Sequence, residues 1–527
     1  MSEIDLDAAA AAIADARQVV DGCAKHLAAH GGVDENQVVA YDLAHAAAAV
    51  EIAAGAVEYG RHGATEASLA AVFVADAVHD VATRVLGREE AWGTSAGALD
   101  KAVSVTAAWR APSFLAGLSG EQGDRHLDGD MLMVTDTFRR FAEDKIRPAA
   151  EHIHRTNGDI PEDIVAGIAE LGAFGLSVPE AYGGWATGGD DEYLAMVVAT
   201  EELSRGSLGA GGSLITRPEI LTRALVKGGT EEQKQEWLPK LATGEVMAAV
   251  AVTEPDYGSD SAAIKVSAVA EGDDYVVNGV KTWCTFAARA DALMLSARTD
   301  PTPGLKHRGL SLFIVPKERG DGHGFVLNQP GGGTLEGRPI DTIGYRGMHS
   351  YEVAFDNWRV PAANLVGGPE GLGKGFYLTM AGFENGRLQT AGRAIGVMQA
   401  AYEAALDYAT NRVVFGQPLA EFQLTQVKLT RIAATIQAAR QFSYHVARLM
   451  ARGDGSMEAS LIKAYVCRAA EWVTREAMQI HGGMGYAEEF PVSRYFVDAR
   501  VLSIFEGADE LLALRVISKR LVESAAP

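Results

Sequence analysis

The chain has 527 residues, too many for one hydrophobic core, and its length predicts about three or four domains. Its 47 lysine and arginine residues stand against 69 aspartate and glutamate residues, a formal net charge of −22. So acidic a surface repels phosphate backbones and anionic lipid, which argues against nucleic-acid and membrane-surface binding. The three cysteines lack paired spacing, so neither a disulfide framework nor a cysteine-based zinc site is predicted, and no metal is expected.

The amino terminus gives no targeting signal, because M-S-E-I-D-L-D is acidic and lacks the basic region of a signal peptide. The longest apolar stretches, such as 43–57, are rich in alanine and interrupted by His45 and Glu51. We expect them to be too weak to span a bilayer. A cytoplasmic location is therefore expected.

Alanine-rich segments predict three helices at the start of the chain, over 4–29, 33–61 and 64–86, separated by glycine-containing turns. A fourth helix is predicted over about 95–109, before Pro112. Residues 1–120 are thus expected to form an all-helical extension.

One pattern in this extension recurs near the carboxy terminus. The letters E-A-S-L occupy 66–69 and again 458–461, and Phe73 and Tyr465 follow at the same helical spacing. The recurrence fits an internal repeat, which would make the extension a degenerate, non-catalytic copy of the carboxy-terminal bundle. It fits equally well a convergence between two alanine-rich amphipathic helices.

Beyond a polar linker at 122–130, the pattern predicts three further domains: helical over 128–245, strand-rich over 246–365 and helical over 366–527. Predicted helices of the first lie at 131–151, 164–171, 189–205, 218–227 and 231–243. Predicted strands lie at 250–253, 264–270, 275–277, 293–297, 310–315 and 353–355. Predicted helices of the last domain lie at 375–411, 421–452, 456–483 and 507–524.

A single carboxylate stands out in the last domain. Glu506 follows the apolar run 501–505 and precedes Gly507. A carboxylate between apolar residues is poorly solvated when charged and can act as a base near neutral pH. The residues also fit a helix-entry carboxylate, with Glu506 or Asp509 facing the amide dipoles of the following helix.

Two further motifs suit the binding of a nucleotide cofactor. V-T-E-P at 252–255, followed by G-S-D at 258–260, ends a predicted strand in a turn and presents a hydroxyl and free amides at a rim. Arg412, in R-V-V-F-G, and the glycine-rich segment Q-I-H-G-G-M-G-Y at 479–486 suit a pyrophosphate, because a guanidinium gives charge-assisted bonds and glycine lets backbone amides approach.

Together with W-C-T at 283–285 and I-F-E-G at 504–507, these motifs resemble those of the acyl-CoA dehydrogenase flavoproteins over about residues 128–527. The resemblance implies an α+β fold: a helical domain, a small antiparallel β-barrel and a carboxy-terminal four-helix bundle, here preceded by the helical extension. It implies that FAD is the cofactor. The FAD-binding residues that it implies are Val252, Thr253, Trp283, Thr285, Arg412, Phe415, Gln423, Gln479, Gly482 and Gly483.

By this resemblance, Thr253 binds the pyrimidine edge of the flavin, Trp283 covers its ring system and Thr285 donates to its reactive nitrogen. The cofactor residues from Arg412 onward would reach FAD bound to a neighbouring subunit, which implies a homo-oligomer, tetramer or dimer. Ala508 stands where the family has threonine and puts one FAD contact in doubt.

The resemblance also implies the reaction. Glu506 would remove the α proton of an acyl-CoA while FAD takes the β hydride, and the electrons would pass to an electron-transfer flavoprotein. Some relatives carry the base on an earlier helix, but Gly386 occupies that position here. The expected substrate-binding residues are Ser259, Arg217, Phe383, Arg387 and Gly507.

The extension and the stretches 338–352 and 382–390 are most similar to members that convert (2S)-methylsuccinyl-CoA to mesaconyl-(C1)-CoA in the ethylmalonyl-CoA pathway. Such a substrate ends in a carboxylate and requires a cation in its pocket. Arg217 is the first candidate, although a surface or helix-capping role fits it equally, and Arg387 is the second. Another short-chain acyl-CoA dehydrogenase, an acyl-CoA oxidase and a non-catalytic binding relative remain alternatives.

Overall fold

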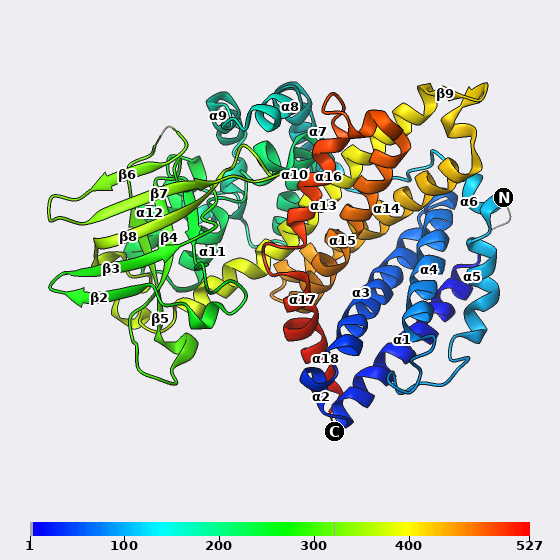
Figure 1. Ribbon diagram of the computed structural model, residues 1–527, viewed down its shortest axis with the longest axis horizontal. Coiled ribbons are helices and arrows are strands. Elements are labelled where there is room, and N and C mark those ends of the chain that lie inside the picture. Colours follow the sequence, from blue (N-terminus) through cyan, green and yellow to red (C-terminus); the bar gives the residue numbers. More distant parts are fainter. Residues whose placement is uncertain (1–3, 321, 527) are drawn as a thin grey trace. The chain divides into compact units, whose positions relative to one another are not determined.

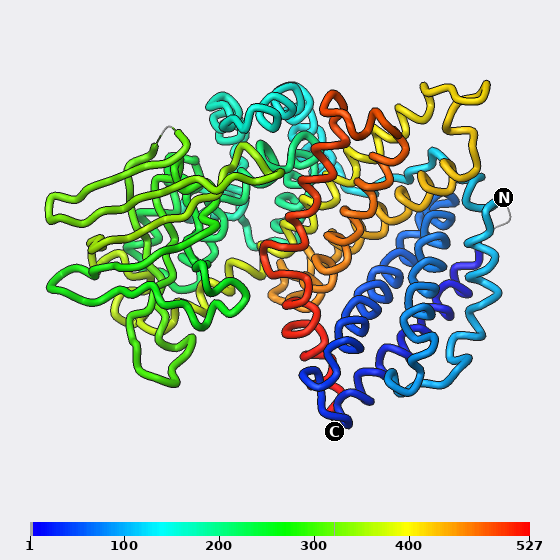
Figure 2. The backbone as a smooth tube through the Cα atoms, in the orientation of Figure 1, coloured from blue at the N-terminus to red at the C-terminus, as the bar shows by residue number. Residues whose placement is uncertain are grey.

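The computed structural model describes residues 4–320 and 322–526 (Figures 1 and 2). The chain forms two compact units. Unit 1 combines the two ends of the chain, Met1–Met133 and Thr390–Pro527, and unit 2 holds Val134–Gln389.

The amino-terminal part of unit 1 is helical, as predicted, with two differences. Its elements are α1 (Leu6–Ala29), α2 (Gly32–Glu35), α3 (Gln37–Gly60), α4 (Ala64–Val85), a 3₁₀ turn (Asp100–Ala102), α5 (Val103–Trp109) and α6 (Pro112–Ala116). The helix predicted over 33–61 is broken at Asn36, whose side chain donates hydrogen bonds to the carbonyls of His30 and Gly32. The helix predicted over 95–109 starts later, because the segment after α4 is mostly turns.

Helix α3 is the central helix of unit 1. By length and composition it could cross a membrane, which the interrupted apolar run had not led us to expect. However, 67% of its most apolar window is buried, and it packs against α1, α4, α14 (Gln423–Ala451) and α15 (Ser456–His481). Its apolar surface therefore serves the core of unit 1.

The carboxy-terminal part of unit 1 has more pieces than the predicted four-helix bundle. Its elements are α13 (Gly375–Asn411, which starts in unit 2), α14, α15, α16 (Val492–Leu502), α17 (Asp509–Leu511), a π-helical segment (Leu512–Ser518) and α18 (Lys519–Ala525). The sequence did not predict α16, because its buried face carries Arg494 and Asp498, 3.8 Å apart, which weakens the apolar period. The last predicted helix is interrupted by the π-helical segment.

Within unit 1, the extension packs directly on the bundle, and Figure 1 shows the blue helices α3 and α4 beside the orange α14 and α15. Both α3 and α4 contact α14, and α3 also contacts α15. The rings of Phe73 and Tyr465 meet edge to face with centroids 5.6 Å apart. The two aromatic residues that follow the recurring E-A-S-L pattern therefore touch, as expected when two similar helix pairs pack face to face.

Unit 2 begins with helices close to those predicted. They are α7 (Gly129–Phe141, whose first residues belong to unit 1), a π-helical turn (Ala142–Ile146), α8 (Arg147–Thr156), α9 (Glu162–Glu170), α10 (Glu192–Gly206), a second π-helical turn (Leu208–Gly212), α11 (Glu219–Gly228) and α12 (Glu231–Thr243). A capping box between Thr230 and Gln233 starts α12, and the Gln233 amide also donates to the carbonyls of Ala363 and Leu365. This side chain fixes the helix to the chain that follows the sheet.

The sheet of unit 2 has eight strands. They are β1 (Ala248–Ala251), β2 (Ser267–Glu271), β3 (Asp274–Lys281), β4 (Ala292–Arg298), β5 (Leu310–Pro316), β6 (Phe325–Asn328), β7 (Thr334–Ile340) and β8 (Ser350–Pro361). The order is β1-β4-β2-β3-β8-β7-β6, with β5 on β4. Pairing is mostly antiparallel, but β1 and β2 each pair with β4 in parallel, which the prediction of a purely antiparallel domain missed. The sequence also missed β6 and β7, because the glycine run 331–333 and Pro339 obscure their pattern.

Candidate active site

The segment that carries Glu506 lies between α16 and α17 in unit 1. Both Glu506 and Gly507 have positive φ, +55° and +94°, so the backbone turns sharply at the carboxylate. A non-glycine residue in this conformation is uncommon and marks a position held by its surroundings. The Glu506 Oε2 atom is buried and has no hydrogen-bond partner among the described residues. The carboxylate is therefore free to accept a proton from a bound molecule.

The amino-terminal extension holds the chain just beyond this carboxylate. The Tyr41 hydroxyl, from α3, donates to Asp509 Oδ2 at 2.5 Å, and His45 Nε2 lies 3.3 Å from the same oxygen. Burial acts to raise the pKa of Asp509, but His45, Tyr41 and Arg468 together lower it below its usual value. The Lys463 ammonium donates to the Gly507 carbonyl. These contacts fix the chain at Gly507 and at Asp509, just beyond Glu506. In the sequence, Tyr41 and His45 show only their spacing on one helical face.

In unit 2, the structure brings together the cofactor residues expected from the strand-rich domain. Val252 and Thr253 follow β1, and the Thr253 carbonyl accepts a hydrogen bond from the Thr282 amide at 2.8 Å. Trp283 is 55% exposed despite its size and has a positive φ of +56°. Thr285 shares a hydrogen bond of 3.0 Å with the Ser350 hydroxyl. An exposed indole beside two threonines forms an aromatic face with a polar edge, which fits a flavin ring.

A buried ion pair lies beside the expected cofactor residues Val252 and Thr253. The Lys281 ammonium, fully buried, donates to Glu254 Oε1 and to the Val252 carbonyl, each at 2.8 Å. The Glu254 carboxylate also accepts hydrogen bonds from the backbone amides of Lys265 and Val266. Burial lowers the pKa of Lys281 to about 8, although the Glu254 carboxylate acts to raise it. Ser259, expected at the substrate, lies exposed in the turn that follows.

In unit 1, the second group of expected cofactor residues lies on the surface. Arg412 and Phe415 lie at the hairpin formed by β9 (Val413–Val414) and β10 (Gln417–Pro418), and Gln423 begins α14. Phe415 is 98% exposed with a φ of +51°, and an exposed aromatic ring on strained backbone marks a candidate interaction site. The Arg412 guanidinium has no ion-pair partner among the described residues.

A ring stack connects this hairpin to the glycine-rich turn. Tyr408, one helical turn before Arg412, stacks on His481 with centroids 4.3 Å apart. Gln479 lies in the last turn of α15, and Gly482 and Gly483 follow it, each exposed and with open space where a Cβ would be. Exposed backbone amides near a free guanidinium suit phosphate oxygens. Both groups of residues thus fit the two ends of a flavin dinucleotide.

Arg217 lies buried in unit 2, two residues before α11, with 5% of its surface exposed. It donates to the Ser213 carbonyl at 3.1 Å and to the Thr216 hydroxyl at 3.3 Å. No carboxylate pairs with it among the described residues. A buried cation without an anionic partner is costly, so this position favours an anionic ligand.

Helix α13 approaches α11 closely at the point where the other expected substrate residues lie. A Cβ at Gly382 would come 2.7 Å from the Ile220 side chain, and Asn385 donates to Glu219. Phe383, next to this contact, packs against the core that contains Ile220. Phe383 and Arg387 are one helical turn apart, so they share a face of α13. Phe383 and Arg387 therefore lie on α13 at its contact with α11, and Arg217 lies two residues before α11 in the sequence.

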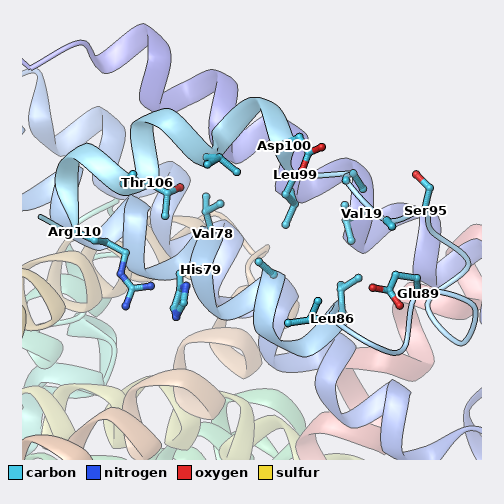
Figure 3. Close-up of a pocket in the computed structure, with 17 residues that line it drawn as sticks. Val19, Val78, His79, Leu86, Glu89, Ser95, Leu99, Asp100, Thr106 and Arg110 are labelled. Carbon is cyan, nitrogen blue, oxygen red and sulfur yellow. The ribbon is translucent and has the colours of Figure 1, made fainter.

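A cavity of about 460 Å³ lies within the amino-terminal helices (Figure 3). Apolar side chains such as Val78 and Leu86 line it, with His79 and Arg110 towards one end and Glu89 towards the other. None of the expected catalytic, cofactor or substrate residues lines this cavity. It is therefore separate from the chemistry described above.

Comparison with known proteins identifies the family. The sequence matches the acyl-CoA dehydrogenase N-terminal domain over 129–245, the middle domain over 249–358 and the C-terminal domain over 373–522. It is 45% identical over 403 residues to (2S)-methylsuccinyl-CoA dehydrogenase of Cereibacter sphaeroides, covering 76% of this chain and 71% of that protein. The chain belongs to the acyl-CoA dehydrogenase family.

Solved structures agree with this assignment. The butyryl-CoA dehydrogenase of Megasphaera elsdenii is 30% identical with a TM-score of 0.66, covering 74% of this chain and 97% of that one. A glutaryl-CoA dehydrogenase from Mycobacterium smegmatis in complex with FADH2 is 26% identical with a TM-score of 0.66, covering 75% of this chain and 95% of that one. The acyl-CoA dehydrogenase fold is confirmed, and the protein is an enzyme whose cofactor is FAD.

Proposed function

We propose that this acyl-CoA dehydrogenase oxidises (2S)-methylsuccinyl-CoA to mesaconyl-(C1)-CoA and passes the electrons to an electron-transfer flavoprotein. The observation that carries the substrate is Arg217, a buried guanidinium with no carboxylate partner among the described residues. A substrate that ends in a carboxylate would supply the missing charge. The 45% identity to the Cereibacter sphaeroides enzyme supports the same choice.

In the proposed reaction, Glu506 removes the α proton of the thioester. The proton passes to the Oε2 atom, which is buried and has no hydrogen-bond partner among the described residues. The expected cofactor residues would hold FAD, which would supply an acceptor for the β hydrogen and its electron pair, so that a double bond forms between the α and β carbons. The bonds to Asp509 and Gly507 keep the base in place while the proton moves.

The substrate proposal predicts that methylsuccinyl-CoA exceeds butyryl-CoA by about one to two orders of magnitude in kcat/KM. Arg217→Met should reduce this difference in kcat/KM, because it removes a charge-assisted pair worth about 1.5 to 3 kcal/mol. It should therefore lower kcat/KM for methylsuccinyl-CoA far more than for butyryl-CoA. Arg338→Met, at an exposed arginine of the same unit, is the matched control and should keep the preference. The measurement is steady-state kinetics with both thioesters and an artificial electron acceptor.

Two outcomes would contradict this proposal in different ways. If the wild-type enzyme prefers butyryl-CoA, the methylsuccinyl-CoA assignment is wrong, and the substrate is a generic short-chain acyl-CoA. Equal loss with both substrates in Arg217→Met would move the carboxylate partner elsewhere, with Arg387, Tyr345 and His349 to be tested next. Stoichiometric hydrogen peroxide during turnover in air would favour an oxidase over transfer to a flavoprotein.

We also infer that the enzyme is a homo-oligomer in which Arg412 and Gln479 reach the FAD of a neighbouring subunit. Their exposure, and that of Phe415, supports this arrangement. Arg412→Ala should then lower FAD retention and oligomer stability together, whereas Arg61→Ala, at an exposed arginine of the extension, should change neither. Gel filtration with detection at flavin and protein wavelengths measures both properties. A variant that retains both would contradict the inference.

A further inference from the structure

Unit 2 holds a cluster of potential metal ligands that contains none of the expected catalytic, cofactor-binding or first-choice substrate-binding residues. Asp159 lies in the loop between α8 and α9, His323 between β5 and β6, and His349 immediately before β8. One ligand atom from each residue lies within 4.8 Å of the others. The three come from distant parts of the sequence, so tertiary folding alone assembles them, and the cysteine spacing could not reveal them.

Two of these ligand atoms lack the hydrogen bonds that buried polar atoms normally make. His349 Nε2 and Asp159 Oδ1 lie 3.1 Å apart as an ion pair, both atoms are buried, and neither makes a well-aligned hydrogen bond to any residue that the structure describes. Leaving such atoms unsatisfied is costly. Two ligands on one tetrahedral zinc ion lie about 3.4 Å apart, given bonds of about 2.0 to 2.2 Å. A shared ion would satisfy both atoms at nearly their present separation.

The third ligand completes an open coordination set. The ring of His323 meets that of His349 edge to face, with centroids 4.5 Å apart. His323 is exposed, whereas His349 is only 7% exposed, so water can reach the cluster from one side. Two imidazoles and one carboxylate suit zinc and similar transition metals, whereas magnesium and calcium prefer oxygen ligands alone. We propose that Asp159, His323 and His349 bind one divalent transition metal ion of the zinc class, with water as the remaining ligand.

The charges around the cluster are compatible with a cation. Arg289 is the nearby positive charge, and it is already occupied by the Ile160 carbonyl at 2.6 Å and by the Glu162 carboxylate. The Asp159 carboxylate offsets part of the charge of the ion itself. A simple ion pair between Asp159 and a protonated His349 would use the same two atoms but would leave His323 without a role.

The position of the site gives it a structural consequence within unit 2. The His349 carbonyl accepts the Phe286 amide at 2.8 Å, and Ser350, the next residue, bonds Thr285. A bound ion would therefore link the α8–α9 loop to the start of β8. Ser350, the first residue of β8, bonds Thr285, which is an expected flavin contact. Because the ion binds the folded chain, it should raise the unfolding temperature of the holoenzyme by an amount that grows with the logarithm of the ion concentration above the dissociation constant.

The test is metal binding by the untagged, FAD-loaded enzyme after removal of metals with a chelator. Zn²⁺ is titrated in competition with a chromophoric chelator, and Co²⁺ binding is followed by its visible absorption. We expect one ion per chain with a dissociation constant of about 1 µM or lower. Zn²⁺ should raise the unfolding temperature, and Mg²⁺ should not.

Substitutions assign the site without reference to activity. His323→Ala removes an exposed side chain and should weaken Zn²⁺ binding by about 100-fold or more. Altering a residue that only hydrogen-bonds to a metal ligand typically weakens binding by about 10- to 100-fold. Asp159→Asn should do the same. His152→Ala, at an exposed histidine of α8, is the control and should leave binding unchanged. Absence of tight binding, or equal binding by His323→Ala and the wild type, would overturn the proposal.

Discussion

Glu506→Gln should retain FAD and bind acyl-CoA but reduce flavin about two to four orders of magnitude more slowly than the wild type. The amide preserves the shape of the side chain and loses its affinity for a proton. The change should be tolerated structurally, because Oε2 has no hydrogen-bond partner among the described residues. Anaerobic stopped-flow absorbance of the flavin measures the reductive step directly.

Glu510→Gln is the matched control for this prediction. Glu510 lies four residues further along and is exposed, and its loss of charge should leave the rate of flavin reduction within about twofold of wild type. Bleaching of Glu506→Gln at a near wild-type rate would remove Glu506 from the role of base. Loss of FAD from this variant would instead indicate a structural role for the carboxylate.

Lys281→Met should destabilise the protein by about 3 to 5 kcal/mol, because it leaves the Glu254 carboxylate buried without its cation. The Lys281 ammonium is fully buried and bonds both Glu254 and the Val252 carbonyl. The loss should also weaken FAD binding, since Val252 and Thr253 are expected to contact the flavin. Urea unfolding of the apoenzyme and the rate of FAD release measure the two effects.

Two variants separate the buried pair from a general effect of losing a lysine. Lys265→Met removes an exposed lysine from the same turn and should cost no more than about 0.5 kcal/mol. Adding Glu254→Gln to Lys281→Met should recover part of the loss, because it removes the unpaired buried charge and the single amide oxygen can still accept from one of the Lys265 and Val266 amides. Equal stability of Lys281→Met and wild type would show that the pair contributes nothing.

Most helices followed from the sequence, because alanine content and glycine or proline boundaries act locally. Helix α12 and the end of α13 fall at the predicted residues, with Thr230 and Gly375 as recognisable starts. The sheet was harder to predict. Strands β6 and β7 depend on pairing with each other and with β8, and their sequences contain a glycine run and Pro339.

Part of the candidate site could likewise be predicted from the sequence, and part could not. Glu506, Thr253 and Trp283 lie in short motifs that a sequence displays directly. The hydrogen bond from Tyr41 to Asp509 and the close contact of His45 with the same carboxylate join residues more than 400 positions apart, so only the folded chain shows them. The cluster of Asp159, His323 and His349 is likewise invisible until three loops meet.

The substrate is tested most directly by anaerobic mixing of the purified holoenzyme with methylsuccinyl-CoA, butyryl-CoA and isobutyryl-CoA in parallel, with the flavin absorbance as the readout. A carboxylate-binding Arg217 predicts rapid and complete bleaching by methylsuccinyl-CoA, with rates about one to two orders of magnitude lower for the two uncharged thioesters at equal subsaturating concentrations. Faster bleaching by butyryl-CoA, or no bleaching by methylsuccinyl-CoA, would contradict the proposed substrate.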